Sequence, residues 1–271
     1  MRETPAEGDW FVQARGARIE RLEAYFDGHA YEPHRHDTYA VGITLSGVQS
    51  FHYRGAHRHS FPGCTLVLHP DEVHDGHAGS DDGFRYRMLY VRPAILQDML
   101  GGQALPFVPG GITQDPRLTQ SVLRLLRRID TPTETLEDDD ALFDLAIALN
   151  ACAGVRAGRR RFDYPAAQRA REFLDAAAGR SVTLTELEAV SGRDRWHLSR
   201  DFRLLFGTSP YRYLTMRRLD RVKQRLHGGH SLSDAALDAG FSDQSHMTRQ
   251  FSDAYGISPG RWRKLVVDAS G

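Results

Sequence analysis

The feature that most constrains the fold of this chain is an internal repeat near its C-terminal end. Residues 197–213 read HLSRDFRLLFGTSPYRY and residues 246–262 read HMTRQFSDAYGISPGRW, and seven of the seventeen positions are identical. Each copy follows a short helical pattern that ends in glycine, LTELEAVSG or LSDAALDAG. The repeat predicts two copies of a helix, a tight turn and a second helix, an arrangement that presents a helix to the DNA major groove. Two copies are too few for a solenoid.

In the first copy, local signals mark both helices. Thr183 and Glu186 predict a capping box, Ser191 and Gly192 permit the turn, and Asp194 caps the next helix. The apolar side chains of that helix share one face, and the polar ones share another, which is available to a partner. The inward set is Leu198, Phe202 and Leu205, and the outward set is Trp196, Ser199, Arg200 and Arg203.

The second copy repeats these signals. Ser231 and Asp234 open its first helix, Gly240 makes the turn and Ser242 caps its second helix. Arginine and glutamine suit bidentate contacts with guanine and adenine, while hydroxyls and tryptophan serve phosphate and thymine-methyl contacts. The alternative is a pair of helical hairpins with merely solvated polar faces, and the matched faces disfavour it. The inward set is Met247, Phe251 and Ala254, and the outward set is Ser245, Thr248, Arg249 and Ser252, with Gln244 near the helix start.

The segment from about 183 to 265 resembles the DNA-binding domain of the AraC/XylS family of bacterial transcription regulators. The resemblance lies in WHLSRDF, GTSPYRYLTMRRLDRVKQRL, AGFSDQSHMTRQF and GISPGRWR. It implies seven helices, of which the one near residues 210–226 holds the two helix-turn-helix units about one DNA turn apart. The DNA-contacting residues expected from the resemblance and the faces are Arg195, Trp196, Ser199, Arg200, Arg203, Gln244, Ser245, Thr248 and Arg249.

The zero net charge of the chain hides a division between its halves. Residues 1–155 hold 14 basic and 22 acidic side chains, whereas residues 156–271 hold 21 basic and 13 acidic ones. A basic half is what contact with phosphate requires, and an acidic half discourages the rest of the protein from lying on DNA. The charge pattern therefore favours duplex DNA as the partner of the C-terminal half.

The N-terminal half shows a different pattern. Short alternating runs between about residues 15 and 91 predict a small β-barrel or sandwich. His34 and His36 lie two residues apart in PHRHDTY and would point to the same side of a strand, and His74 follows a glycine turn and another strand. This stretch resembles the cupin barrel that serves as the effector-binding domain in many AraC/XylS regulators. The resemblance implies a small-molecule effector site at His34, His36 and His74, with Tyr39 either facing the ligand or filling the core.

In cupin enzymes the corresponding histidines ligate a metal, and His34, His36 and His74 would suit Zn²⁺ or Fe²⁺. The catalytic pattern also places a carboxylate four residues after the second histidine, where this chain has Ala40. The sequence therefore favours an effector-controlled regulator without enzymatic activity. A metal-dependent cupin enzyme, or a metal or pH sensor, fused to a DNA-binding module is the alternative. The remaining histidines of this region are expected in hairpins and loops, namely His52, His57, His59, His69 and His77.

Two amphipathic helices are expected after the barrel, where they either only cover it or also form an interface between two chains. In the resembled family the corresponding helices form the dimer interface, so we expect a homodimer joined along the second apolar stripe, around Leu142, Leu145 and Leu149. RNA polymerase is the further protein partner that we expect. The two stripes are Leu118, Val122, Leu125, Leu126 and Ile129, and then Leu142, Leu145, Ala146, Leu149 and Ala153.

These patterns predict an α+β chain with two domains. Residues 1–155 form a cupin-like barrel with trailing helices, residues 156–165 form an arginine-rich linker, and residues 166–271 form an all-α domain with two helix-turn-helix units. The start of the sequence lacks a secretory signal and no window is apolar enough to span a bilayer, so we expect a cytoplasmic protein without a membrane partner. Cys64 and Cys152 are too few for a disulfide framework or a zinc knuckle.

Overall fold

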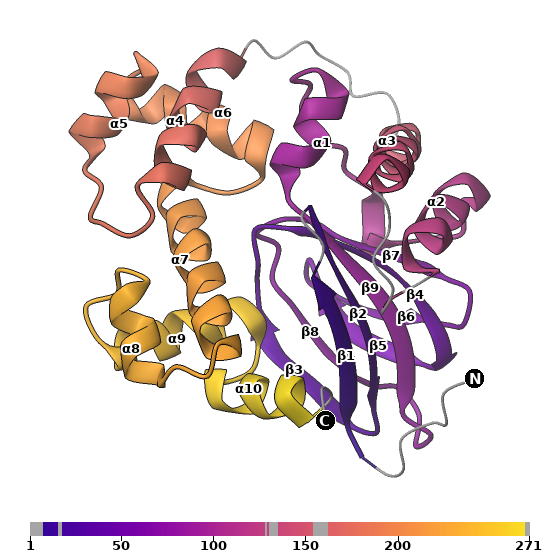
Figure 1. Cartoon of the computed structure of the whole chain (residues 1–271). Coiled ribbons are helices and arrows are strands. Elements are labelled where there is room, and N and C mark those ends of the chain that lie inside the picture. Colours follow the sequence, from indigo (N-terminus) through magenta and orange to yellow (C-terminus); the bar gives the residue numbers. More distant parts are fainter. Residues whose placement is uncertain (1–7, 16–17, 128, 130–134, 154–161, 269–271) are drawn as a thin grey trace.

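The computed structural model describes the whole chain except residues 1–7, 16–17, 128, 130–134, 154–161 and 269–271. Within the described residues, all strands belong to the N-terminal half and the C-terminal third is entirely helical (Figure 1). The sheets form a cupin-like barrel, and the two parts lie side by side in contact. The predicted α+β fold is thereby confirmed.

Two antiparallel sheets form the barrel, because the sequence alternates between side chains that face the interior and side chains that face outward. The larger sheet has the order β1 (Trp10–Arg15), β2 (Ile19–Phe26), β9 (Phe84–Val91), β4 (Tyr39–Gly47), β7 (Thr65–Leu68) and β10 (Ile112–Thr113). The smaller sheet has the order β3 (His29–His34), β8 (His74–Ala78), β5 (Gln49–Tyr53) and β6 (Ala56–Ser60).

Helices cover the outer face of the larger sheet. They are α1 (Pro93–Leu100), the short 3-10 helix η1 (Pro109–Gly111), α2 (Pro116–Leu126) and α3 (Thr135–Cys152). The apolar stripe of α2 packs on β4 and β9, and that of α3 packs on α2 and α1 within the same hydrophobic cluster. The expectation that Leu142, Leu145 and Leu149 form a dimer seam is wrong, since α3 packs against α2 and α1 and each of the three leucines is 0% exposed.

Seven helices follow in the described C-terminal part, as the family resemblance implies. They are α4 (Tyr164–Ala176), α5 (Leu184–Ser191), α6 (Arg195–Phe206), α7 (Pro210–His227), α8 (Leu232–Asp238), α9 (Gln244–Tyr255) and α10 (Pro259–Asp268). The two helix-turn-helix units lie at opposite ends of α7 (Figure 1). The expected linker, residues 156–165, falls mostly outside the described residues. Its last residues already belong to α4, because Asp163 caps that helix and Pro165 suits its first turn.

The hydrophobic core does not divide between the two parts of the chain. One cluster joins Leu22 and Met88 inside the barrel to Val222 of α7 and to Phe251 and Trp262 beyond it. A separate cluster holds the first helix-turn-helix unit together with Ala94 of α1. The second unit therefore shares its core with the barrel, and the first does not.

Among the described residues, no helix has both the length and the apolar character needed to cross a membrane.

Candidate functional site

The first unit consists of α5, a turn and α6. The amide of Glu186 donates to Thr183 Oγ1 at 3.2 Å and the amide of Thr183 donates to the Glu186 carboxylate at 2.8 Å, which is the predicted capping box. Gly192 follows α5 with φ of 71°, a left-handed conformation that glycine adopts without strain. Asp194 caps α6 by accepting two amide hydrogens of its first turn. The local signals read from the sequence are confirmed in the first unit.

The second unit consists of α8, a turn and α9. Ser231 caps α8, and Gly240 makes the turn with φ of 87°. The expectation that Ser242 caps α9 is wrong, because Asp243 Oδ1 accepts from the amide of His246 at 2.7 Å. A carboxylate interacts more strongly than a hydroxyl with the positive end of a helix, and Ser242 instead donates to Asp243.

The faces of the recognition helices α6 and α9 agree with the expected inward and outward sets. The inward residues are buried, namely Leu198, Phe202, Leu205, Met247, Phe251 and Ala254. Trp196 is 74% exposed, an unusual position for a large aromatic side chain and one that marks an interaction surface. The other expected DNA-contacting residues are exposed or half-buried, namely Arg195, Ser199, Arg200, Arg203, Gln244, Ser245, Thr248 and Arg249.

The outward arginines differ in their partners. Arg200 donates through Nε and Nη2 to the carboxylate of the neighbouring Asp201. Arg203 donates through Nη1 to the backbone oxygen of Ser199 at 3.2 Å, and also contacts its hydroxyl. Arg249 has neither a side-chain hydrogen bond nor an ion pair within the described part of the chain.

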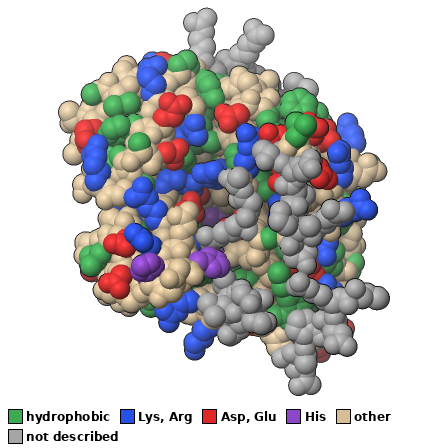
Figure 2. Space-filling view, in the orientation of Figure 1, with side chains coloured by type: hydrophobic (Ala, Val, Ile, Leu, Met, Phe, Trp, Pro, Cys, Tyr) green, Lys and Arg blue, Asp and Glu red, His purple; other side chains and the backbone are tan. Residues whose placement is uncertain are grey.

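Basic side chains are distributed over the helical part rather than gathered in one block. Figure 2 shows Lys and Arg side chains on this part, at the left of the view, with acidic side chains between them. Much of the positive charge is therefore locally balanced. Free N–H donors on the outward faces of α6 and α9 remain available to a polyanion.

A second candidate site lies inside the barrel, where a cavity of about 110 Å³ is closed by the C-terminal part. This volume holds several waters or a small ligand. Strands of both sheets form most of the wall, and α7 and the segment around α9 and α10 complete it. The wall from the C-terminal part consists of Met216, Asp220, Lys223, Tyr255, Ile257 and Trp262.

The three predicted histidines meet in this cavity. Ligand atoms of His34, His36 and His74 lie within 4.8 Å of one another, and all three side chains are buried. Each Nδ1 lies 2.8–3.0 Å from a backbone carbonyl oxygen, that of residue 32, 38 or 72. A carbonyl oxygen only accepts, so Nδ1 carries the proton and Nε2 keeps a free lone pair. A hydrogen bond from one ring nitrogen to a backbone carbonyl, with the other nitrogen left free, is typical of metal-ligating histidines.

The three imidazoles are neutral near neutral pH. Burial lowers the pKa of all three, and repulsion from the neighbouring His74 lowers the pKa of His34 and His36 further, well below the ordinary value. Neutral imidazole is the form that ligates metals or accepts hydrogen bonds from a ligand. The donor set therefore fits Zn²⁺ or a small molecule with N–H or O–H groups.

Of the two roles expected for Tyr39, the place in the core is confirmed and the contact with the effector is wrong. Tyr39 is buried on the other face of the larger sheet and donates from its hydroxyl to the carbonyl of Pro106 at 2.6 Å. Alternation along β4 sends Tyr39 and Val41 toward the covering helices and Ala40 into the cavity. His69 likewise lies in the buried interior, where its Nε2 accepts from the amide of Val108.

Contacts between the barrel and the C-terminal part surround the cavity. Arg217 of α7 donates to Asp37 at 2.6 Å. The amide of Glu32 donates to the carbonyl of Gly256 at 3.2 Å, and the amide of Arg35 donates to that of residue 253 at 3.2 Å. The strand that carries His34 is thus bonded directly to the C-terminal end of recognition helix α9.

The cavity wall from the C-terminal part was not expected from the sequence. Arg217 and Lys223 lie among the buried residues of α7, which also include Leu219 and Val222. Charged residues on the buried side of a helix indicate buried partners, and Lys223 pairs with Glu20 of β2 at 3.2 Å. This signal points to a docking surface but does not identify the partner strand.

Comparisons with known proteins agree with this architecture. The sequence profile of the AraC-like ligand binding domain matches residues 16–146, and that of a helix-turn-helix domain matches residues 187–265. The uncharacterized HTH-type transcriptional regulator YbfI of Bacillus subtilis is 27% identical over 83% of this chain and 86% of its own length. The HTH-type transcriptional activator RhaS of an Enterobacter strain is 24% identical over 85% of this chain and 86% of its own length.

Among solved structures, unsaturated fatty acid-bound ToxT of Vibrio cholerae superposes with a TM-score of 0.64 at 11% identity, over 99% of each chain. At this identity the likeness shows the fold alone. With one profile on each part of the chain, relatives that match along most of its length and the same order of barrel and repeated helix-turn-helix units, the chain belongs to the AraC/XylS family of transcription regulators.

Proposed function

We propose that both units of this regulator bind one face of a DNA duplex, with α6 and α9 in successive major grooves. The observation that carries the proposal is the duplicated recognition helix, whose outward face is exposed in both copies and holds Arg200 or Arg249 at the equivalent position. Trp196 suits a thymine-methyl contact, and Gln244 suits adenine. Residues 166–271 are the proposed DNA-binding domain, and residues 1–155 the proposed effector-binding and dimerisation domain.

Arg200→Ala and Arg249→Ala are each expected to weaken binding to the preferred duplex by about 1–3 kcal/mol, because each removes a bidentate donor. The affinity of the unaltered chain should fall steeply with salt as phosphate contacts release counterions. Fluorescence anisotropy with labelled duplex checks both, and circular dichroism checks that the variants stay folded. Phe202→Ala is the matched control for the buried face, since it should cost about 3–5 kcal/mol of stability. A chain that binds no duplex at low salt would end the proposal.

We further propose that an effector occupies the cavity and shifts the equilibrium between docked and released arrangements of the C-terminal part. The support is that walls from both parts enclose one volume, so an occupant touches both and acts through its differential affinity. Gln13 Oε1, Asp37 Oδ1 and Gln49 Oε1 are buried on the wall without a hydrogen-bond partner in the described structure. These acceptors favour a small effector rich in hydrogen-bond donors.

A divalent metal is the second candidate ligand, and the convergence of three neutral imidazoles favours it. Bound Zn²⁺ would be held by His34, His36 and His74 and would supply a positive charge beside the docking surface. Isothermal titration of the unaltered chain with Zn²⁺ is expected to show one equivalent that is lost in His36→Ala. His59→Ala is the control, because His59 is exposed on β6, an edge strand of the smaller sheet. No Zn²⁺ binding by the unaltered chain, or equal binding by His36→Ala, would exclude the metal site. The small organic effector would then be the remaining candidate ligand.

We infer that the chain is a regulator without catalytic activity of its own, acting in the cytoplasm where bacterial DNA is found. The support is that the histidine group contains no carboxylate ligand and that Ala40 lines the cavity where the catalytic pattern has one.

We also propose a homodimer and contact with RNA polymerase. The proposed dimer surface is the outer side of α3, where Phe143 and Ile147 are 50% and 49% exposed.

A further inference from the structure

An exposed arginine and a buried carboxylate stand side by side on recognition helix α6. Arg200 has an exposed side-chain fraction of 55%, whereas that of Asp201 is 1%. Arg200 Nε and Nη2 donate to Asp201 Oδ1 at 3.2 and 3.1 Å. A fork of two N–H groups on one carboxylate oxygen restricts the torsions of the arginine side chain.

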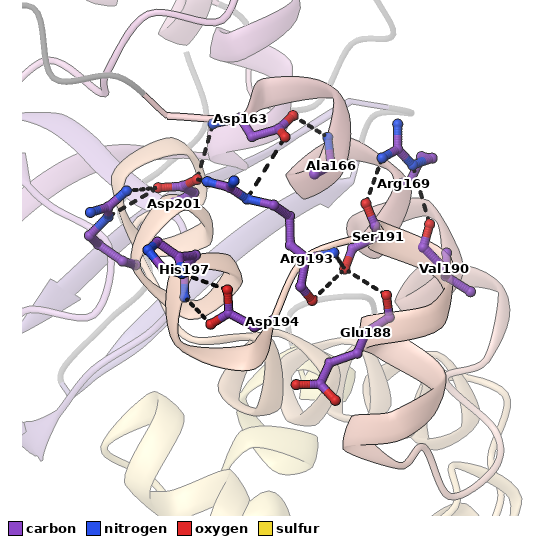
Figure 3. A network of polar contacts seen from close by, with 11 residues as sticks. Asp163, Ala166, Arg169, Glu188, Val190, Ser191, Arg193, Asp194, His197 and Asp201 are labelled. Carbon is purple, nitrogen blue, oxygen red and sulfur yellow. Dashed lines mark hydrogen bonds and ion pairs between the residues drawn. The ribbon is translucent and has the colours of Figure 1, made fainter.

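Asp201 is itself held in place from the other side (Figure 3). Its Oδ2 accepts from the amide of Asp163 at 3.0 Å and from Arg193 Nη2 at 3.2 Å. Although burial alone would raise it, these donors and Arg200 hold the pKa of Asp201 below its ordinary value. The carboxylate is therefore charged, and the start of α4 and the turn of the first unit fix its orientation.

This network leaves a defined edge of Arg200 for a partner. The guanidinium uses Nε and one Nη2 hydrogen on Asp201, and Nη1 has no partner within the described part of the chain. The free edge, Nη1 with the second Nη2 hydrogen, has the spacing that matches O6 and N7 of guanine. Because the side chain is already ordered, binding removes less rotamer freedom than it would from a free arginine.

The second unit lacks this arrangement. The repeat offset of 49 residues places Arg249 opposite Arg200 and Gln250 opposite Asp201. Gln250 carries no charge, and Arg249 has no ion pair in the described structure. Two copies with the same recognition arginine thus differ in the group that orients it.

We propose that Asp201 is a positioning residue that orients Arg200 toward one guanine, so that the first unit discriminates between bases more strongly than the second. The proposal rests on the proposed DNA-binding function and adds to it a cause of sequence specificity. The residue next to the recognition arginine, rather than the arginine alone, sets how sharply each half of the operator is read.

The test uses the full chain and duplexes from a binding-site selection. At the guanine read by the first unit, changing G·C to A·T should weaken binding of the unaltered chain about 10-fold or more. Asp201→Asn should reduce that ratio to about 3-fold or less while the discrimination in the second half stays unchanged. In an Arg200→Ala background, Asp201→Asn should have no further effect on the ratio. Arg195→Ala is the control, expected to weaken all duplexes alike.

A second measurement covers the case in which Asp201→Asn fails to fold. Side-chain ¹⁵N relaxation of the free, unaltered chain should show an ordered Nε–H for Arg200 and a mobile one for Arg249, with Arg200→Lys and Arg249→Lys giving the assignments. Equal mobility of the two, or an Asp201→Asn variant that loses affinity equally for all duplexes, overturns the positioning role. A chain without any DNA binding would instead overturn the proposed function, so the two failures are distinguishable.

Discussion

Arg217 and Asp37 form an ion pair that is buried on both sides and joins residues 180 positions apart in the sequence. Although burial alone would lower it, the carboxylate of Asp37 raises the pKa of Arg217 above its ordinary value. The guanidinium therefore stays charged. The net gain from such a pair is small because both groups lose their hydration, but its loss on one side leaves an uncompensated charge.

We expect Arg217→Ala to lower the free energy of unfolding by about 3–5 kcal/mol, because Asp37 then stays buried without its partner. The control is Arg225→Ala, which removes the exposed pair between Arg225 and Asp238 and should change stability by about 0.5 kcal/mol or less. Urea denaturation followed by circular dichroism measures both. Equally small losses would mean that water reaches the Asp37 carboxylate.

Helix α3 has two apolar faces, of which one is buried and the other is exposed. The face with Leu142, Leu145 and Leu149 packs inside the chain, whereas Phe143 and Ile147 face outward. Helical spacing revealed the stripe of Leu142, Leu145 and Leu149 in the sequence, but spacing alone does not tell which neighbour covers it. Helices α1 and α2 cover it, because the three helices pack together as one layer on the outer face of the barrel.

Leu145→Asp and Ile147→Asp are therefore expected to act differently. The first places a charge in the closed core and should unfold the N-terminal half, with a loss of several kcal/mol. The second should keep the melting temperature within a few degrees and convert the proposed dimer to a monomer. Light scattering and thermal melting separate the two effects. A monomeric unaltered chain, or a dimer that survives Ile147→Asp, would exclude this face of α3 as the seam.

Gly256 joins the second unit to the barrel, since its carbonyl accepts from the amide of Glu32. A Cβ at this residue would lie 2.7 Å from the oxygen of Glu32 and 2.7 Å from His34 Nδ1, closer than real contacts allow. The approach of recognition helix α9 to the histidine strand thus depends on the absence of a side chain.

Gly256→Ala should loosen this docking, because the new methyl group displaces the strand or the helix. The matched control is Gly101→Ala, where φ is +62° against +67° and no atom lies within 4 Å of the added Cβ. Both variants carry the strain of a left-handed alanine, about 1–2 kcal/mol. Only Gly256→Ala also loses the contact with the strand of Glu32 and His34. Hydrogen exchange at the amides of Glu32 and Arg35 should accelerate in Gly256→Ala alone. Unchanged protection there would mean that the contact adapts to the methyl group.

The parts of this architecture that depend on local signals could be predicted from the sequence. The capping box at Thr183 and the inward face around Phe202 and Phe251 follow from spacing within one helix turn. Tyr39 could not be placed, because a period of two residues gives two faces without saying which one is the interior. The cavity wall at Lys223 could not be placed either, since its partner Glu20 lies 203 residues away.

The two helix-turn-helix units should differ in thermal stability, because only the second shares a hydrophobic core with the barrel. The second unit packs with the barrel interior through Met247 and Phe251, while the first packs around Phe202 with α1 and α4. Heat should therefore melt the second unit together with the barrel in one cooperative transition, and the first unit in another. A ligand bound in the barrel should raise the melting temperature of the transition that the barrel shares with the second unit. The melting temperature of the first unit should stay nearly unchanged. The two copies of one motif belong to different cooperative units, and only one of them gains stability directly from what the barrel binds.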